Sequence, residues 1–382
     1  MAMMEAGMRG THKNRISATF TLIKETRIEI STTEDFSECL YDTGMRTDID
    51  PLCFIPEIKW LERTRYFWRV TVLDNVKEMA ISDVAFFETP ADRINGKWIK
   101  SPFDKDKHSV FMKKWELPDD CIRARLYITS LGLYEAYING EKVSDEYLTP
   151  FYNDYNHWIQ YQTFGLTSSI RKGGNALGIM LGNGWYKGRF GFIDKLDRLY
   201  GDTQQFVCEL EMTMADGKKM TVSSDESFGC ALSPVIESSI YDGEVYDSRR
   251  EIPDWAQYSC ATDGFVRSIV VEKSDEEKSL VRPRKSLPLT VRQYVAPVQK
   301  ISTPAGETVI DFGQEISGFV SFFCHEPKDS VIKLNFGEIL QDGNFYNDNL
   351  RTAKEEFCYI SNGDERNVRP HFTFYGFRYM KV

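Results

Sequence analysis

Short runs rich in β-branched and aromatic residues, each closed by Gly, Asn or Asp, recur along the chain. No amphipathic helical period is sustained over a dozen residues. This pattern is typical of sheets built from short strands, and it predicts an all-β chain of tandem β-sandwiches. The clearest runs are TRIEIST (26–32), RYFWRVTVLDN (65–75), ARLYITSLGLYEAYINGEKV (124–143), TVIDFGQEISGFVSFFCHEP (308–327) and SVIKLNFGEIL (330–340).

Two dipeptides predict tight hairpins. Asn139-Gly140 stands between AYI and EKV, and both residues tolerate the positive φ values of a type I′ turn. Asp216-Gly217 stands in MADGKKM in the same way. Both sites are therefore expected to join antiparallel strands.

Composition shifts divide the chain into three modules. The polar link within FFETPADRINGKW (86–98) ends a first module at residues 1–92, and the charged, proline-bearing stretch VEKSDEEKSLVRPRKSLP (271–288) ends a second module at 93–285. A third module occupies 286–382. It closes with HFTFYGFRYMKV, which alternates as a strand does.

Charge and hydropathy exclude several classes of partner. The 382 residues carry a formal net charge of -10, which argues against nucleic acid. No stretch of about 18 apolar residues occurs, so no membrane helix is expected. The first residues lack the apolar core of a signal peptide, and the eight cysteines show no CxxC pair. We therefore expect reduced cysteines and a cytoplasmic location.

Motifs for metal or nucleotide chemistry are absent from the sequence. The five histidines are scattered without HExxH spacing, and no GxxxxGK[ST] motif occurs. Two carboxylates at a suitable separation would suffice for glycoside hydrolysis, but spacing alone does not select a pair among the 57 Asp and Glu residues. No catalytic residue is therefore assigned.

Two stretches combine rings, amides and charges in a way that suits a sugar, whose hydroxyls form bidentate hydrogen bonds while its C–H face stacks on a ring. They are LGNGWYKGRFGF (181–192) and SSIYDGEVYDSRREIPDW (238–255). The opposing interpretation is a solvated rim in which Arg249 or Arg250 forms an ordinary surface ion pair. The candidate carbohydrate-binding residues are Asn183, Trp185, Tyr186, Arg189, Tyr241, Asp242 and Glu244.

No cofactor is assigned with certainty. The acidic residues Asp242 and Glu244 are candidate Ca²⁺ ligands, because hard oxygen donors at alternate positions suit that ion. The glycines of LGNGWYKG give Asn183 and Trp185 room to project, either toward a sugar ring or toward the YDGEVYD segment.

Taken together, three long motifs resemble one family, the bacterial α-L-rhamnosidases that invert configuration and carry a helical catalytic barrel. WLERTRYFWRVTVLDN is similar to their fibronectin-III-like strands. GLYEAYINGEKV through LGNGWYKGRFGF, with SSIYDGEVYDSRREIPDW, is similar to their jelly-roll module. VIDFGQEISGFVSF through RPHFTFYGFRYMKV is similar to their concanavalin-like β-sandwich.

The resemblance implies hydrolysis of terminal α-L-rhamnose by two glutamates on the helical barrel. This sequence contains no such barrel and ends where the barrel begins in the family, so we expect a truncated, non-catalytic chain that is inactive alone. Its expected partners are a rhamnose-containing glycan or glycoside and the missing barrel. Some members use the jelly-roll module to bind rhamnose with calcium.

Two alternatives remain open. One is a free-standing carbohydrate-binding module. The other is a structural scaffold that docks a separate catalytic chain, which predicts an exposed apolar patch near Phe372, Phe374 and Phe377. The aglycone, the oligomeric state and the occupancy by metal or sugar do not follow from the sequence.

Overall fold

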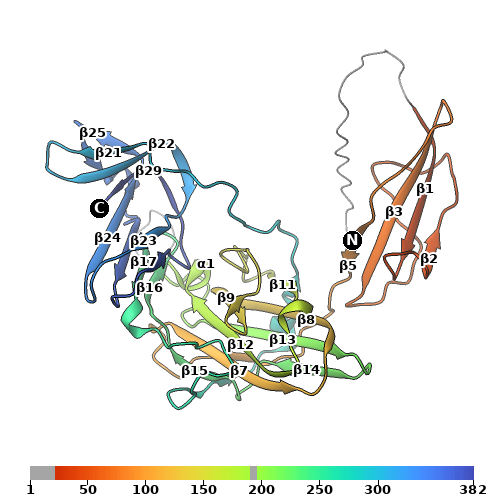
Figure 1. Ribbon diagram of the computed structural model, residues 1–382, viewed down its shortest axis with the longest axis horizontal. Coiled ribbons are helices and arrows are strands. Elements are labelled where there is room, and N and C mark those ends of the chain that lie inside the picture. Colours follow the sequence, from red (N-terminus) through yellow and green to blue (C-terminus); the bar gives the residue numbers. More distant parts are fainter. Residues whose placement is uncertain (1–21, 190–195) are drawn as a thin grey trace. The chain divides into compact units, whose positions relative to one another are not determined.

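The computed structural model describes residues 22–189 and 196–382, and these form two compact units, residues 1–92 and 93–382 (Figure 1). Residues 190–192 of the glycine-rich stretch lie outside the described part. Nearly all regular structure is strand, as predicted. Within the described residues, no helix has the length and apolar character needed to cross a membrane.

The first unit contains one antiparallel sheet in the order β2-β1-β3-β4, with β5 also on β3. Ile28, Ile30 and Tyr66 are buried on one face, where Trp60 packs edge-on against Tyr66. The fibronectin-III-like assignment of this unit stays a prediction. The strands are β1 (Ile23–Ser31), β2 (Cys39–Asp42), β3 (Arg65–Asp74), β4 (Met79–Ile81) and β5 (Ala85–Glu88).

The second unit begins with a β-sandwich, here called the first sandwich. One sheet has the order β10-β9-β12-β7-β15-β18, and the other has the order β19-β6-β13-β8-β11-β20, with β14 on β13. The strands of the former are β7 (Ser109–Leu117), β9 (Leu133–Ile138), β10 (Glu141–Lys142), β12 (Gly173–Gly182), β15 (Gly229–Leu232) and β18 (Val266–Arg267). Those of the latter are β6 (Trp98–Lys100), β8 (Cys121–Leu131), β11 (Ile159–Gly165), β13 (Gln205–Met214), β14 (Lys219–Ser223), β19 (Ile269–Val271) and β20 (Val281–Pro283).

Alternating apolar positions of both sheets meet in the core of the first sandwich. Phe111 of β7 and Ile179 of β12 face Leu126 of β8 and Phe206 of β13, and all four are fully buried. The Phe111 and Phe206 rings pack edge to face at 5.0 Å. This burial is the main source of stability for the sandwich.

Both predicted hairpins are confirmed. Asn139 and Gly140 take φ values of 51° and 91° between β9 and β10, as a type I′ turn requires. Asp216-Gly217 joins β13 to β14, with Gly217 at φ 80°. The residue types at these two turns therefore determine the hairpin connections.

A seven-stranded sheet follows, here called the C-terminal sheet, in the order β16-β17-β27-β24-β29-β22-β21. β16 and β17 come from residues before 285, and β17 pairs in parallel with β27. The strands are β16 (Val235–Ser239), β17 (Gly243–Asp247), β21 (Gln299–Ser302), β22 (Thr308–Gly318), β24 (Val331–Gly337), β27 (Glu356–Ile360) and β29 (Tyr375–Lys381). Two small sheets accompany it, β23 (Phe322–Cys324) with β28 (Arg366–Val368) and β25 (Ile339–Gln341) with β26 (Asn344–Tyr346).

The first sandwich and the C-terminal sheet share one apolar core. Val110 and Met180 of the sandwich belong to the same buried cluster as Phe336, Phe357 and Phe372. The two parts of residues 93–382 are therefore packed together, although the division at residue 285 was predicted from the linker-like composition of 271–288. That stretch contains regular structure, α2 (Asp275–Ser279) and β20.

Few helical turns interrupt the strands. A capping box between Ser274 and Glu277 caps the N-terminus of the α2 helix. α1 (Gly184–Lys187) forms within the glycine-rich stretch, and the described residues also contain the 3₁₀ turns η1 (Thr167–Ser169), η2 (Ser248–Arg250) and η3 (Asp348–Leu350). Residues 284–298, between β20 and β21, form neither helix nor strand.

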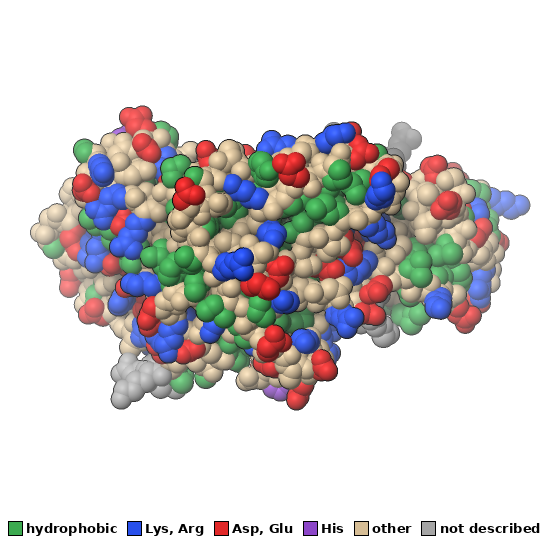
Figure 2. Space-filling view, turned by 90° about the horizontal axis from the view of Figure 1, so that it is seen from below, with side chains coloured by type: hydrophobic (Ala, Val, Ile, Leu, Met, Phe, Trp, Pro, Cys, Tyr) green, Lys and Arg blue, Asp and Glu red, His purple; other side chains and the backbone are tan. Residues whose placement is uncertain are grey.

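The charged side chains on the surface are of both signs, as the mixed Lys, Arg, Asp and Glu content of the sequence leads one to expect. On the face shown in Figure 2, Lys and Arg side chains are interspersed with Asp and Glu side chains, and the described residues there show no continuous basic patch. This face therefore offers nothing that favours a phosphate backbone over other partners.

Candidate functional site

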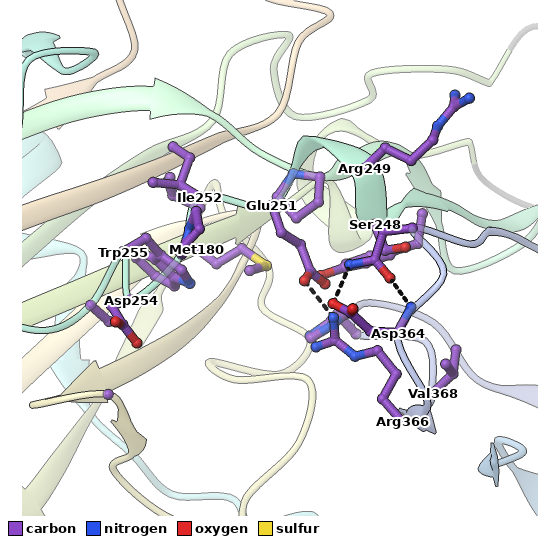
Figure 3. A pocket seen from close by; sticks show the side chains of 18 of the residues that line it. Met180, Ser248, Arg249, Glu251, Ile252, Asp254, Trp255, Asp364, Arg366 and Val368 are labelled. Carbon is purple, nitrogen blue, oxygen red and sulfur yellow. Dashed lines mark hydrogen bonds and ion pairs between the residues drawn. The ribbon is translucent and has the colours of Figure 1, made fainter. Parts of the chain in front are cut away.

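A cavity of about 660 Å³ lies between the first sandwich and the C-terminal sheet (Figure 3). Pockets of this size enclose small-molecule ligands. Three parts of the chain line it: strands of the first sandwich, the segment that follows β17, and loops of the C-terminal region. Lining residues used below are Tyr137, Met180, Tyr246, Glu251, Ile252, Trp255, Tyr359, Arg366, Arg369 and His371.

Trp255 and its apolar neighbours form one end of the cavity. Figure 3 shows Trp255 beside Ile252 and Met180. The Tyr137 ring meets the indole edge to face at 5.3 Å. A Cβ on Gly178 would come within 2.7 Å of the indole Cζ3, so the absence of a side chain there lets Trp255 lie against β12. The ring is thereby held in one place.

The opposite end is polar. Tyr246 donates its hydroxyl hydrogen bond to Glu251 Oε1 at 2.6 Å, and Arg366 Nη1 donates to Glu251 Oε2. Figure 3 shows this pair away from the Trp255 group. The Tyr246 ring stacks with the His371 ring at 5.3 Å and with the Tyr359 ring at 6.1 Å. These stacked rings fix the polar groups at the cavity wall.

A buried carboxylate holds two residues that line the cavity, Arg369 and His371. Glu135 of β9 is 2% exposed and accepts hydrogen bonds from Arg369 Nη2 at 2.9 Å, from the Tyr137 hydroxyl at 2.5 Å and through a 2.8 Å contact with His371 Nδ1. Burial disfavours its charge, but His371 and Arg369 outweigh burial and hold the pKa of Glu135 well below its usual range. Glu135 is therefore an ionised anchor for residues 366–372, here called the strap.

Glu244, a predicted sugar and calcium ligand, also holds the strap. Its carboxylate accepts hydrogen bonds from the backbone N–H groups of His371, at 2.9 Å, and Phe372, at 2.8 Å. It is 2% exposed, and burial raises its pKa. The sequence identified Glu244 as notable, and the structure gives it protein partners.

The predicted residues Arg189 and Asp242 pair with each other. Arg189 donates to both carboxylate oxygens of Asp242, at 3.1 and 2.5 Å, and also to the Thr352 carbonyl. The guanidinium lies 4.9 Å from the centre of the predicted Tyr241 ring. All three predicted residues thus join the glycine-rich stretch to the segment that precedes β17.

Asn183 makes a second connection between the same two stretches. Its backbone N–H donates to Ser238 Oγ at 2.9 Å, and its side-chain amide donates to the Ser238 carbonyl at 2.8 Å. Gln204 donates to its side-chain oxygen at 2.8 Å. Asn183 thus contacts Ser238, which lies just before YDGEVYD, one of its two predicted partners.

Trp185 and Tyr186 lie in an aromatic cluster apart from the cavity lining. Trp185 packs edge to face with Phe151 at 5.4 Å and with Tyr152 at 6.0 Å. Tyr186 packs against Tyr155 at 5.0 Å, and burial raises its pKa. Phe151 and Tyr152 are exposed, so this cluster is a second aromatic surface.

Asp242 and Glu244, the candidate Ca²⁺ ligands, are engaged by different protein donors. Asp242 is bound to Arg189, and Glu244 is bound to backbone N–H groups. Across residues 22–189 and 196–382, no group of three or more His, Cys, Asp or Glu side chains is arranged to hold a metal ion. The described geometry therefore gives the calcium hypothesis no support.

The cavity residues Arg369 and His371, and their partner Glu135, were missed by sequence reasoning, because Glu135 is far from the other two along the chain. Trp255 and Tyr246 belong to the stretch 238–255 that the sequence identified, but neither was among the predicted carbohydrate-binding residues. A signal existed for Tyr246: Glu244 and Tyr246 alternate on β17 and share one face of it.

Two known domain families match this chain. The α-L-rhamnosidase N-terminal domain matches residues 119–293, and the bacterial α-L-rhamnosidase concanavalin-like domain matches residues 301–382. The chain belongs to the bacterial α-L-rhamnosidase family. This confirms the resemblance drawn from the motifs.

The curated proteins that are similar in sequence to this chain include two α-L-rhamnosidases. An α-L-rhamnosidase of Streptomyces avermitilis is 32% identical over 77% of the chain, and one of an Alteromonas species is 28% identical over 85%. The match spans 29% of the former protein's length and 37% of the latter's. This α-L-rhamnosidase-family chain is therefore much shorter than these relatives.

Solved structures share the fold. The α-L-rhamnosidase of Aspergillus terreus superimposes with a TM-score of 0.89 at 28% identity, covering 94% of this chain and 42% of that one. The Streptomyces avermitilis enzyme, solved with L-rhamnose, gives a TM-score of 0.83 at 20% identity over 94% of this chain and 52% of that one. The latter likeness concerns the fold alone.

Proposed function

We propose that this chain is a non-catalytic β-sandwich portion of an α-L-rhamnosidase and that it binds rhamnose-containing glycosides in the cavity between the first sandwich and the C-terminal sheet. The family supports the substrate class. The observation that carries the binding role is the cavity itself, in which Trp255 offers a ring face and Glu251 and Arg366 offer bidentate polar groups.

Calorimetric titration with L-rhamnose tests the binding role. Heat that saturates at millimolar sugar, and that is lost in Arg366→Ala, supports it. No heat at millimolar sugar contradicts it. Titrations with and without Ca²⁺ should agree, because Asp242 and Glu244 are engaged by protein donors.

Incubation with an aryl α-L-rhamnoside tests the non-catalytic role. We expect no release of nitrophenol from the purified chain. Release that disappears on mutation of a carboxylate of this chain would show that it is itself a hydrolase.

A scaffold role is a second candidate, favoured by residues 284–298. Leu287 and Tyr294 are 84% and 88% exposed in this extended segment, which is apolar surface suited to a covering domain. The patch predicted near Phe372, Phe374 and Phe377 is not present, because Phe372 and Phe377 are buried. We propose the helical barrel of the family as the occupant of the exposed segment.

Sedimentation of the chain with a separately expressed rhamnosidase barrel tests the scaffold role. A complex that is lost in the double variant Leu287→Ser, Tyr294→Ser supports it. Independent sedimentation of the two proteins contradicts it.

A further inference from the structure

Four Asn-Gly pairs occur in the chain, at residues 95–96, 139–140, 183–184 and 362–363. In such a pair the glycine nitrogen can attack the side-chain amide of the asparagine, because no glycine side chain shields it. We propose that Asn362 is a site of spontaneous deamidation in the folded protein and that the fold protects the other three. This inference concerns a covalent modification and does not depend on the proposed binding function.

The reaction exchanges an amide for a carboxylate without an oxidant or a cofactor. The backbone nitrogen of Gly363 forms a bond to Cγ of Asn362. The side-chain nitrogen leaves as ammonia and takes up the proton that the Gly363 nitrogen loses. Water then adds to one of the two carbonyl carbons of the resulting succinimide ring and opens it to an aspartyl or an isoaspartyl residue. In total, one water is consumed and one ammonia is released.

The reacting atoms at Asn362 already have suitable partners. The backbone N–H of Gly363 donates to Ser361 Oγ at 3.0 Å, so an acceptor lies at the proton that this nitrogen must lose. The backbone N–H of Asp364 donates to Oδ1 of Asn362 at 3.0 Å. A donor therefore lies at the oxygen that becomes negative when Cγ is attacked, as in an oxyanion hole.

The turn between β27 and β28, which carries Asn362, lies at the surface. Gly363 and Asp364 are exposed, and Gly363 takes a φ of 94°, which glycine adopts readily. Within the described part of the chain, both hydrogen bonds of the Asn362 amide go to Asp364, at 2.9 and 3.0 Å. Rotation of this amide toward the Gly363 nitrogen therefore breaks no bond to another element, and such local opening costs little free energy.

The amides of Asn95 and Asn139 are held by distant parts of the chain. Asn95 Nδ2 donates to the buried carboxylate of Glu209 at 3.0 Å. Asn139 Nδ2 donates to the Ser169 carbonyl at 2.9 Å, and Asn139 Oδ1 accepts from the Ala176 N–H at 2.9 Å. Attack on either amide has to break these contacts first, which slows the reaction in the folded chain.

Asn183 is protected in two ways. Its amide donates to the Ser238 carbonyl and accepts from Gln204, both at 2.8 Å. The nitrogen that would attack belongs to Gly184, which is buried in the first turn of α1. Succinimide formation there would require the loss of both hydrogen bonds and a distortion of α1.

Deamidation of Asn362 would place a new carboxylate in the cavity wall. Asn362 lines the cavity, as do Asp364 and Arg366, which Figure 3 labels. The amide that donates to the Asp364 carboxylate would become a second carboxylate, and the two like charges repel each other. An isoaspartyl residue would also lengthen the backbone by one carbon atom just before the strap. We therefore expect the modified turn to loosen.

Mass spectrometry of proteolytic peptides measures all four sites in one sample. The whole chain is incubated at mildly alkaline pH, folded in buffer or unfolded in urea, until the sites in the unfolded chain have converted. In the folded chain we expect Asn362 to convert several-fold faster than the other three asparagines. In the unfolded chain the four should convert at similar rates, because the protection by the fold is lost.

Two outcomes of this experiment overturn the inference. One is an Asn362 that stays intact in the folded chain while the sites in the unfolded chain convert. The other is conversion of Asn139 or Asn183 in the folded chain at the rate of Asn362. Neither outcome depends on the folding of a variant.

Matched variants test the assignment independently. Asn362→Gln should remove most of the ammonia released by the folded chain, because glutamine forms its larger ring much more slowly. Asn95→Gln is the control and should leave the release unchanged. Equal release from Asn362→Gln and the unmodified chain overturns the assignment to Asn362.

Hydrogen exchange tests the effect on the turn. We expect residues 361–366 to exchange several-fold faster in Asn362→Asp than in Asn362→Gln, since the former alone adds a charge beside Asp364. Equal exchange in the two variants would overturn the expected loosening of the turn.

Discussion

Three glutamates hold the strap at residues 366–372, and each does so with a different partner. Glu135 binds Arg369 and His371, Glu244 binds two backbone N–H groups, and Glu251 binds Arg366. Buried carboxylates are tolerated only when donors surround them. The strap is thus held by charge-assisted hydrogen bonds rather than by apolar burial alone.

Arg369→Met should destabilise the chain by about 2–4 kcal/mol, because it leaves the buried charge of Glu135 without the guanidinium that donates to it. Chemical unfolding followed by tryptophan fluorescence measures the change. Lys218→Met is the control: its partner is Asp216 on an exposed turn, and the loss should stay below about 1 kcal/mol. Equal losses in the two variants would contradict the role given to Arg369.

Glu355 gives a second residue-level prediction, on pH. Burial, together with the carboxylates of Glu338 and Glu315, raises the pKa of Glu355 from 4.5 to about 7. Its Oε2 is buried and has no hydrogen-bond partner among the described residues. The folded state therefore keeps a proton that the unfolded state releases between these two values, so stability should fall as pH rises from about 5 to about 8.

Glu355→Gln should remove about 1–2 kcal/mol of this pH dependence, a figure reduced for partial solvent screening, and should raise stability at pH 8. Unfolding curves at pH 5 and pH 8 measure it. Glu276→Gln, on the exposed α2 helix, should leave the dependence as it is. If Glu355→Gln retains the full pH dependence of stability, Glu355 is not its source.

At the scale of elements, the glycine-rich stretch lets two parts of the chain approach closely. A Cβ on Gly182, the last residue of β12, would lie 2.3 Å from Cγ of the fully buried Phe372 ring. The glycines were predicted to give room to neighbouring side chains. The structure shows that Gly182 gives room to the strap.

Gly182→Ala should therefore destabilise the contact between β12 and the strap by about 1–3 kcal/mol, the range for overpacking a close-packed core. Thermal unfolding measures the effect. Gly264→Ala is the control, because a Cβ there meets nothing within 4 Å, and it should be close to neutral. An unchanged midpoint for Gly182→Ala would show that the strap adjusts without cost.

At the scale of the whole molecule, residues 1–92 and 93–382 are separate compact units. Each has its own buried cluster, around Tyr66 in the first and around Phe111 and Phe357 in the second. We expect two transitions in differential scanning calorimetry of the full chain. Residues 93–382 expressed alone should keep the larger transition at an unchanged temperature, and a large shift would show that the units depend on each other.

Truncation at residue 285, unlike truncation at residue 92, should disrupt the fold of the remaining fragment. Strands β16 and β17 lie before it, and their partner β27 lies after it. Residues 93–285 alone would expose the edge of β17 and the apolar side chains that meet Phe357. We expect this fragment to aggregate or to bind hydrophobic dyes, and a soluble fragment with native near-UV circular dichroism would contradict that expectation.

Much of the strand content and both hairpins could be predicted from the sequence, because they depend on local alternation and on turn residues such as Asn139-Gly140. The family could be predicted because its motifs are long and occur in order. The candidate site could be predicted only in part. The segment 238–255 was identified, yet Trp255 and Tyr246 line the cavity, whereas Asn183, Arg189 and Asp242 bind other parts of the chain.

The sequence by itself determined the fold class, the turns and the family, since these follow from patterns within a few residues or within one motif. The tertiary structure alone decided which polar groups are available to a ligand. A carboxylate such as Glu244 looks the same in the sequence whether it faces a sugar or a backbone N–H. Its partner, His371, is distant along the chain, and only the packing of β17 against the strap brings the two together.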